Sequence, residues 1–188
     1  IEQAAYIDSV RMADGKRSVL LLHAGDFGQG TSYFTELGGN IEIDVMNAAG
    51  YDAVALGNHE FDNGAAELAR RLRNLKADAV CANYDFTGNP LEGLVKPYVI
   101  VRRAGKKIGI IGLLTDISRV VDRSLLGGLE YQEPAPVVNR YADYLKNEKD
   151  CDLVICLSHL GYTSDKELAI ECFIVDRFKV NSITHMNW

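Results

Sequence analysis

The sequence has 188 residues, 47% of them hydrophobic, which is enough for one well-buried α/β domain and excludes a disordered or collagen-like chain. Its 20 Lys and Arg residues against 26 Asp and Glu residues give a net charge of −6, so no basic face is available for a nucleic-acid backbone. We therefore expect no nucleic-acid partner, and because no long apolar stretch is present we expect no membrane span.

The first half of the chain alternates between helix and strand. Apolar residues keep helical spacing over residues 4–11, and residues 18–22 form a short apolar run typical of a buried strand. The pattern repeats with a helix over residues 41–49, closed by Gly50, and a second strand over residues 53–56. This alternation predicts parallel strands joined by helical crossovers.

The second half adds a hairpin to this alternation. In chain order we expect a helix over residues 65–75, a strand over 79–82, a hairpin formed by 98–102 and 107–114, a helix over 137–145 and a strand over 152–157. The fold class is therefore α/β, with a mostly parallel sheet, helical cover and an antiparallel part contributed by the hairpin.

Polar side chains follow four of the predicted strands. Asp26 comes after the first strand, Asn58 and His59 after the second, Asn83 after the third and His159 after the last. Right-handed crossovers bring the carboxyl ends of parallel strands to one edge of a sheet, so we expect these residues to be neighbours. Their oxygen and nitrogen donors suit divalent metal ions and phosphate oxygens, which points to metal-assisted phosphoester hydrolysis.

Residues 57–62, Gly-Asn-His-Glu-Phe-Asp, carry most of this chemistry. The amide oxygen of Asn58 can bind a cation without adding charge, although a turn residue after Gly57 is an equally good reading of Asn58 alone. His59 is a candidate ligand or general acid, and Asp62, three residues on, is close enough to orient its ring. The alternative is a structural histidine with Asp62 as a helix cap.

The functional assignment of Asp26 and His159 depends on the other polar residues that are predicted at the ends of neighbouring strands. Taken alone, Asp26 in a Gly-Asp turn is usually a cap or turn former, and a histidine at a strand end is more often structural than a ligand. We assign no catalytic role to Glu60, which we expect to make local hydrogen bonds or a salt bridge, or to His23, which has the wrong strand parity relative to Asp26.

The four cysteines, at positions 81, 151, 156 and 172, show no C-x-x-C spacing, and we expect them to be buried packing residues. They leave the redox compartment open. Residues 1–12 also lack the long apolar core of a signal peptide.

Together, Gly25-Asp26, residues 57–62 and residues 158–161 (Ser-His-Leu-Gly) resemble the calcineurin-like metallophosphoesterases. Within that family the chain is similar to the catalytic domain of the 5′-nucleotidase and UDP-sugar hydrolase branch. Residues 24–31, 51–56, 81–85 and 96–98 extend the likeness, which covers residues 3–170. It implies a four-layer α-β-β-α sandwich with mixed sheets and a single catalytic domain over residues 1–188, of which 171–188 form an unmatched tail.

The resemblance also implies roles for the residues singled out above. Asp26 would bridge two divalent metal ions, drawn from Mn, Zn, Fe, Co or Mg, and Asn58 and His159 would be ligands of one of them. Asn58 and His59 would contact the phosphate of a small-molecule nucleotide or phosphate ester, and His59, oriented by Asp62, would stabilise the transition state or protonate the leaving oxygen. Relatives of this branch are commonly exported, which implies a periplasmic or extracellular location.

The resemblance departs at two places. The family's Asp-x-His on its first strand and its Gly-His-x-His or Gly-His-x-Gln turn have no counterpart in the sequence. One metal position keeps Asp26, Asn58 and His159, whereas the other keeps only the shared Asp26, so we expect metal on the Asn58 and His159 side. The alternative function is a non-catalytic binding or assembly module on the same fold with an incomplete metal site.

Overall fold

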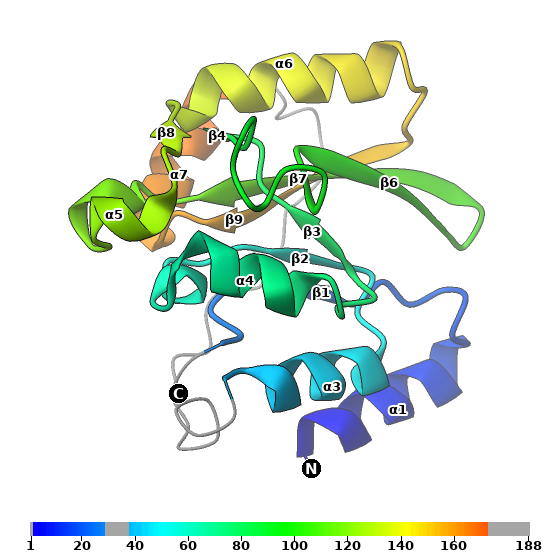
Figure 1. Cartoon of the computed structure of the whole chain (residues 1–188). Coiled ribbons are helices and arrows are strands. Elements are labelled where there is room, and N and C mark those ends of the chain that lie inside the picture. Colours follow the sequence, from blue (N-terminus) through cyan, green and yellow to red (C-terminus); the bar gives the residue numbers. More distant parts are fainter. Residues whose placement is uncertain (1, 29–37, 173–188) are drawn as a thin grey trace.

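The computed structural model describes residues 2–28 and 38–172, and the predicted tail beyond residue 172 lies outside the described residues. Two sheets pack face to face, with α1, α3 and α4 on the outer side of one and α6 and α7 on the outer side of the other (Figure 1). This arrangement confirms the expected α-β-β-α layering.

The first sheet is entirely parallel and has the strand order β1-β2-β3-β5. Its strands are β1 (Leu22–His23), β2 (Ala53–Ala55), β3 (Asp78–Val80) and β5 (Val95–Lys96). The first strand is shorter than the predicted run over residues 18–22. The N–H of Leu21 donates to the side-chain carboxylate of Asp52 at 2.9 Å, so regular pairing with β2 begins only at Leu22.

The second sheet has the order β6-β7-β9 and contains the predicted hairpin. Its strands are β6 (Tyr98–Arg103), β7 (Lys106–Leu114) and β9 (Leu153–His159). β6 and β7 are antiparallel around Ala104 and Gly105, which both have left-handed φ values, of 49° and 77°. β9 runs parallel to β7 and ends with His159 opposite Leu114. His159 is thus the last residue of its strand, two residues beyond the predicted strand end at 157.

The helical elements and a small two-stranded sheet complete the chain. The helices are α1 (Glu2–Asp14), α3 (Asn40–Ala49), η1 (His59–Phe61), α4 (Gly64–Leu72), η2 (Ile117–Arg119), α5 (Arg123–Leu126), α6 (Pro134–Asn147) and α7 (Tyr162–Glu171), and the small sheet pairs β4 (Tyr84–Asp85) with β8 (Glu130–Tyr131). Among the described residues, no helix combines the length and the apolar composition needed to cross a bilayer.

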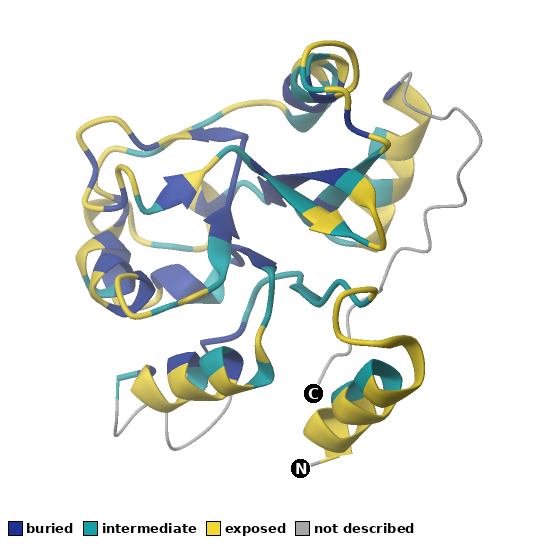
Figure 2. Cartoon of the chain, turned by 90° about the vertical axis from the view of Figure 1, so that its right-hand side faces the viewer, coloured by how far each residue is buried: buried dark blue, intermediate teal, exposed yellow. Residues whose placement is uncertain are grey.

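Helix α3 shows how burial selects one of two apolar faces. It buries Ile43 and Met46, whereas Ile41 and Val45 are 37% and 61% exposed. The 3.6-residue period fits both stripes, so the sequence pattern over residues 41–49 does not tell which of them is buried. Helix α1 buries no residue at all and is mostly exposed (Figure 2). The guanidinium of Arg11 ties it to α3 by donating to the main-chain oxygens of Ala49 and Gly50.

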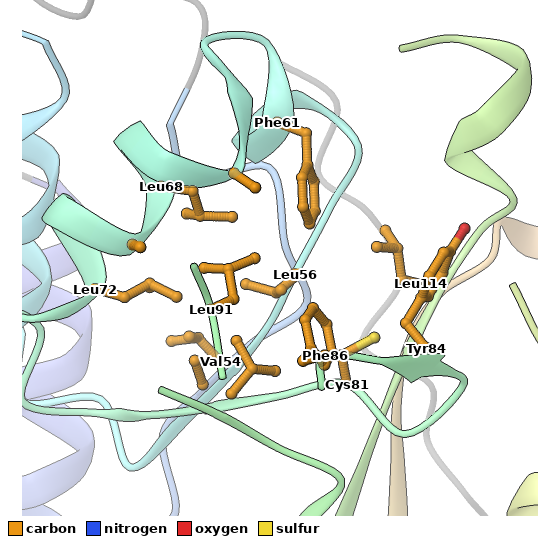
Figure 3. Close-up of a cluster of buried hydrophobic side chains, with 14 of the residues drawn as sticks. Val54, Leu56, Phe61, Leu68, Leu72, Cys81, Tyr84, Phe86, Leu91 and Leu114 are labelled. Atoms are coloured by element: carbon orange, nitrogen blue, oxygen red, sulfur yellow. The ribbon is translucent and has the colours of Figure 1, made fainter. Parts of the chain in front are cut away.

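A large apolar core lies between the first sheet and its helices. Figure 3 shows Leu68 and Leu72 of α4 packing toward Val54 and Leu56, with Phe61 of η1 alongside. Phe61 is fully buried, so it anchors the turn that carries the neighbouring polar residues His59 and Asp62.

The two sheets make a very close backbone approach at Gly112 of β7. A Cβ atom at this position would lie 2.1 Å from the carbonyl oxygen of Val80, and the N–H of Ala82 donates to the oxygen of Gly112 at 2.8 Å. Only glycine fits there. The contact brings the carboxyl ends of strands from both sheets to the same region of the molecule, which positions the site described next.

Candidate functional site

Asp26 and His159 come together from different sheets. Asp26 lies in the loop after β1, and His159 ends β9; Oδ2 of Asp26 is 3.2 Å from Nε2 of His159. Asp26 has a left-handed backbone with φ of 57°, a conformation that costs free energy in any residue except glycine. The two residues are 133 positions apart in the chain, and both halves of the fold lie between them. The predicted convergence of these two side chains is therefore present.

The orientation of the His159 ring follows from its second hydrogen bond. Nδ1 lies 2.7 Å from the carbonyl oxygen of Ala24, which can only accept, so Nδ1 carries a proton. Nε2 is left facing the Asp26 carboxylate. His159 is 5% exposed, and burial by itself lowers its pKa, but the hydrogen bond and charge of Asp26 outweigh burial and hold the pKa above its ordinary value. Burial raises the pKa of Asp26, yet its pKa lies below the ordinary value because of the bond to His159 and its charge.

Two glycines make room for this pair. A Cβ atom on Gly57 would lie 2.1 Å from Oδ1 of Asp26, and a Cβ atom on Gly25 would lie 2.7 Å from Nδ1 of His159. Any other residue at either position would displace a candidate ligand. Glycine at positions 25 and 57 is thus required by the close approach of the two loops.

His59 and Asp62 form a second pair beside the first. Nδ1 of His59 is 3.0 Å from Oδ2 of Asp62, and their side chains are 35% and 37% exposed. The main-chain N–H of His59 donates to Oδ1 of Asp26 at 3.1 Å, which places the His59 turn directly against the candidate metal ligand. Asp62 does orient the His59 ring in the structure. It makes no side-chain cap to α4, whose N-cap residue is Asn63.

Asn58 precedes η1 and is half-buried. Within the described part of the chain its side chain makes no hydrogen bond, so its amide oxygen is available to a ligand. Asn58 lies in the same turn as His59, whose N–H bonds to Asp26.

Asn83 and His23 have other tasks. Asn83 is fully buried, where its side-chain amide donates to the oxygen of Leu114 at 2.7 Å and accepts from the N–H of Leu114 at 2.9 Å. Both ends of the Asn83 amide thus join β7 to the loop after β3, so its polar atoms are engaged by the main chain. His23 accepts from the N–H of Gly25 through Nδ1, and its ring lies edge-on to Phe27 and Tyr51. Burial lowers the pKa of His23.

Glu60 is the residue whose role the sequence did not reveal. Its carboxylate is fully buried and accepts from the N–H groups of Gly57, Asp26 and Gly28. Burial raises the pKa of Glu60, while the three N–H bonds act in the opposite direction. The predicted local hydrogen bonding is present at Gly57, but the bonds to Asp26 and Gly28 span 34 and 32 residues, and no local pattern predicts such partners.

The donor set fits one divalent cation in part. Two ligand atoms bound at about 2.1 Å and about 90° apart lie about 3.0 Å from each other, close to the spacing between Asp26 and His159. The tautomer of His159 also directs a nitrogen lone pair toward the carboxylate, an arrangement that calls for a proton or a cation between them. Within residues 2–28 and 38–172, no group of three or more His, Cys, Asp or Glu residues could hold a metal ion.

Sequence comparisons agree with the geometry. The family model described as "Calcineurin-like phosphoesterase" matches residues 4–185. A probable 5′-nucleotidase of Treponema pallidum is 37% identical over 161 residues, covering 85% of this chain and 27% of that protein. The 5′-nucleotidase of Rattus norvegicus is 36% identical over 156 residues, covering 81% of this chain and 27% of that protein.

Solved structures show the same relationship. A 5′-nucleotidase precursor from Thermus thermophilus superposes with a TM-score of 0.80 at 36% identity, over 88% of this chain and 32% of that one. The NAD nucleotidase of Haemophilus influenzae gives a TM-score of 0.77 at 36% identity, over 88% and 29%. The chain thus spans less than a third of the length of these four proteins.

Proposed function

Because the chain belongs to the calcineurin-like phosphoesterase family, we propose that it is the catalytic part of a metal-dependent phosphomonoesterase that acts on nucleoside monophosphates or related nucleotides. The observation that carries the proposal is the meeting of Asp26 and His159 across the two sheets. The main-chain N–H of His59, whose ring is paired with Asp62, donates to Oδ1 of the same Asp26. Relatives named 5′-nucleotidase support the choice of substrate.

Asp26, Asn58 and His159 would hold a divalent cation, with Asp26 shared with a second one. The chemistry that such cations supply is polarisation of the phosphoryl oxygens and activation of water for attack on phosphorus. The buried environment of His159, together with its bond to Ala24, keeps Nε2 directed at this position without a change of rotamer.

His59 would act on the substrate itself. The Asp62 carboxylate can only accept, so it holds a proton of His59 on Nδ1. When the ring is also protonated on Nε2, that nitrogen can donate to a phosphoryl oxygen or give its proton to the departing alkoxide. The half-buried Asn58 amide, one residue earlier, can hold a second phosphoryl oxygen.

A phosphatase assay tests this proposal. We expect the chain, supplied with Mn²⁺, Co²⁺ or Zn²⁺, to release inorganic phosphate from a nucleoside monophosphate and from an aryl phosphate. Asp26→Ala is expected to abolish turnover, and His59→Ala to lower kcat by about 100-fold or more. Glu67→Gln, a change at a partly exposed residue of α4 that pairs with Arg70, is the control and should turn over as the unaltered chain does.

The alternative of a non-catalytic binding module predicts a different result. If the folded chain binds nucleotide and cation but releases no phosphate, and His59→Ala behaves in the same way, the binding module is supported and the enzyme is contradicted. The pairing of His59 with Asp62 favours the enzyme, because an imidazole held by a carboxylate can pass a proton to a leaving oxygen as well as bind phosphate.

A further inference from the structure

The Glu60 carboxylate joins the two loops that carry the candidate site. Its Oε2 accepts from the N–H of Gly57 at 2.6 Å and from that of Asp26 at 2.8 Å, and its Oε1 accepts from the N–H of Gly28 at 2.9 Å. Gly57 belongs to the loop after β2, whereas Asp26 and Gly28 belong to the loop after β1. One side chain therefore fixes three main-chain N–H groups in two loops.

The Asp26 bond has a direct consequence for the candidate ligand. Asp26 is a non-glycine residue with φ of 57°, and a hydrogen bond to its own N–H offsets part of the cost of that conformation. With the backbone held in this way, Oδ1 meets the N–H of His59 and Oδ2 meets His159. A relaxed Asp26 backbone would turn the carboxylate away from both.

The main chain of Glu60 is itself held by a hydrogen bond from α4. The guanidinium of Arg71, which is 1% exposed, donates to the main-chain oxygen of Glu60 at 2.7 Å. Phe61, the next residue, is fully buried in the core. The hydrogen bonds thus run from α4 through Glu60 to both loops, and Glu60 is placed independently of any ligand.

We propose that Glu60 is a positioning residue that sets the affinity of the Asp26 and His159 pair for a divalent cation by fixing the Asp26 backbone. The effect on cation affinity rests on the proposed function, which supplies the cation. The fixing of the Asp26 backbone by Glu60 does not require a cation. Glu60 touches neither the substrate nor the reacting atoms; it acts through Asp26.

The variant Glu60→Gln tests the proposal. It keeps the size of the side chain but replaces one acceptor oxygen with an NH₂ group, so at least one N–H of the two loops loses its partner. Substitution of groups that support a metal ligand typically weakens metal binding by about 10- to 100-fold, and we expect the Kd for Mn²⁺ to rise by about this factor. Glu67→Gln makes the same chemical change at a partly exposed residue of α4 and is expected to leave this Kd unchanged.

Two readouts separate positioning from loss of stability. At saturating Co²⁺, the visible absorption bands of Glu60→Gln should differ in position from those of the unaltered chain, whereas a variant that is merely less stable would show the same bands. The amide protons of Asp26, Gly28 and Gly57 in the unaltered, metal-free chain should exchange with solvent through one common opening, because they share one acceptor residue. The exchange measurement needs no variant, so it decides the structural part even where Glu60→Gln does not fold.

The outcomes distinguish this proposal from the proposed function. An unaltered chain that binds neither Mn²⁺ nor Co²⁺ contradicts the proposed function, and the exchange data then decide whether Glu60 positions Asp26. The positioning role is contradicted if the unaltered chain binds Mn²⁺ and a folded Glu60→Gln has the same Kd for Mn²⁺ and the same Co²⁺ absorption bands. Three amides that open independently would contradict it as well.

Discussion

The chemistry of the site depends on pairs of side chains whose partners fix their protonation. His159 donates through Nδ1 to Ala24 and presents Nε2 to Asp26, and His59 donates through Nδ1 to Asp62. In each pair the acceptor holds a proton on Nδ1. The two histidines share this arrangement but have different environments, one buried and one half-exposed.

The Asp26 and His159 pair makes the stability of the metal-free chain depend on pH. The folded-state pKa of His159 lies above 6.5, so the stabilisation from its charged form is fully present below the unfolded pKa and is lost as the pH rises through the folded pKa. The pKa of Asp26 is lowered from 3.8, so its contribution is present above that value and is lost as the pH falls through the folded pKa.

We therefore expect the Tm in EDTA to fall as the pH is raised from about 6.5 upward. The variant His159→Gln can still donate to Ala24 but carries no charge, and thermal unfolding of this variant should show a smaller fall over the same interval. Equal pH dependence of the two proteins would contradict the assignment of a charged His159 in the metal-free state.

The sequence predicted the His59 and Asp62 pair because both residues lie on one short turn. It predicted the meeting of Asp26 with His159 because both were placed at the ends of strands. It could not predict Glu60, whose partners at Asp26 and Gly28 are distant in the chain, or the buried bonds of Asn83 to Leu114. A polar residue at a strand end can bind a ligand or another strand, and only the tertiary structure decides between these.

At the level of the secondary-structure elements, the close packing of the two sheets depends on Gly112, which has no side chain. A Cβ atom at position 112 would lie 2.1 Å from the carbonyl oxygen of Val80, and a carbonyl oxygen in a paired strand cannot move without breaking the sheet. We expect Gly112→Ala to lower the free energy of unfolding by about 3 kcal/mol, measured by urea denaturation.

Gly93→Ala is the control for this change. Gly93 has φ of 76°, but a Cβ atom there would meet no atom within 4 Å, so only the backbone conformation opposes the substitution. Its expected cost is about 1 kcal/mol. A cost for Gly112→Ala no larger than that of the control would show that the sheets can separate at this point without penalty.

Helix α1 is weakly attached to the rest of the fold. It buries no residue, and the side chain of Arg11 bonds to the main chain at the end of α3. We expect Arg11→Ala to speed amide exchange throughout α1 while the exchange of α4 stays unchanged, measured by hydrogen exchange and mass spectrometry. Lys16→Ala, just beyond the helix, should have no such effect. Unchanged exchange in α1 would mean that other contacts hold the helix.

Element types were predictable where two independent signals agreed. The hairpin combined two apolar runs with an Ala-Gly turn, and α4 combined a helical apolar period with a preceding polar turn. The buried face of α3 was not predictable, because Ile41 and Val45 form an apolar stripe as regular as that of Ile43 and Met46. Packing against neighbouring elements selects between two such stripes.

The fold as a whole places at one site groups that come from separate sheets. The parallel first sheet brings the loops after β1 and β2 together, and β9 of the second sheet delivers His159 to the same place (Figure 1). The α-β-β-α class was predictable through the family resemblance. The close approach at Gly112, which brings the sheets together, was not, because periodicity within a strand says nothing about the distance between sheets.

The proposed chemistry requires Asp26 and His159 to hold a cation between them with the help of Asn58. An anomalous difference map from crystals of this chain soaked in Mn²⁺ would reveal such a cation. We expect a peak within bonding distance, about 2.1–2.3 Å, of Oδ2 of Asp26 and Nε2 of His159, with the Asn58 amide oxygen turned toward it. If crystals soaked at millimolar Mn²⁺ give a map in which both side chains are in place but no peak lies between Asp26 and His159, the pair binds no cation.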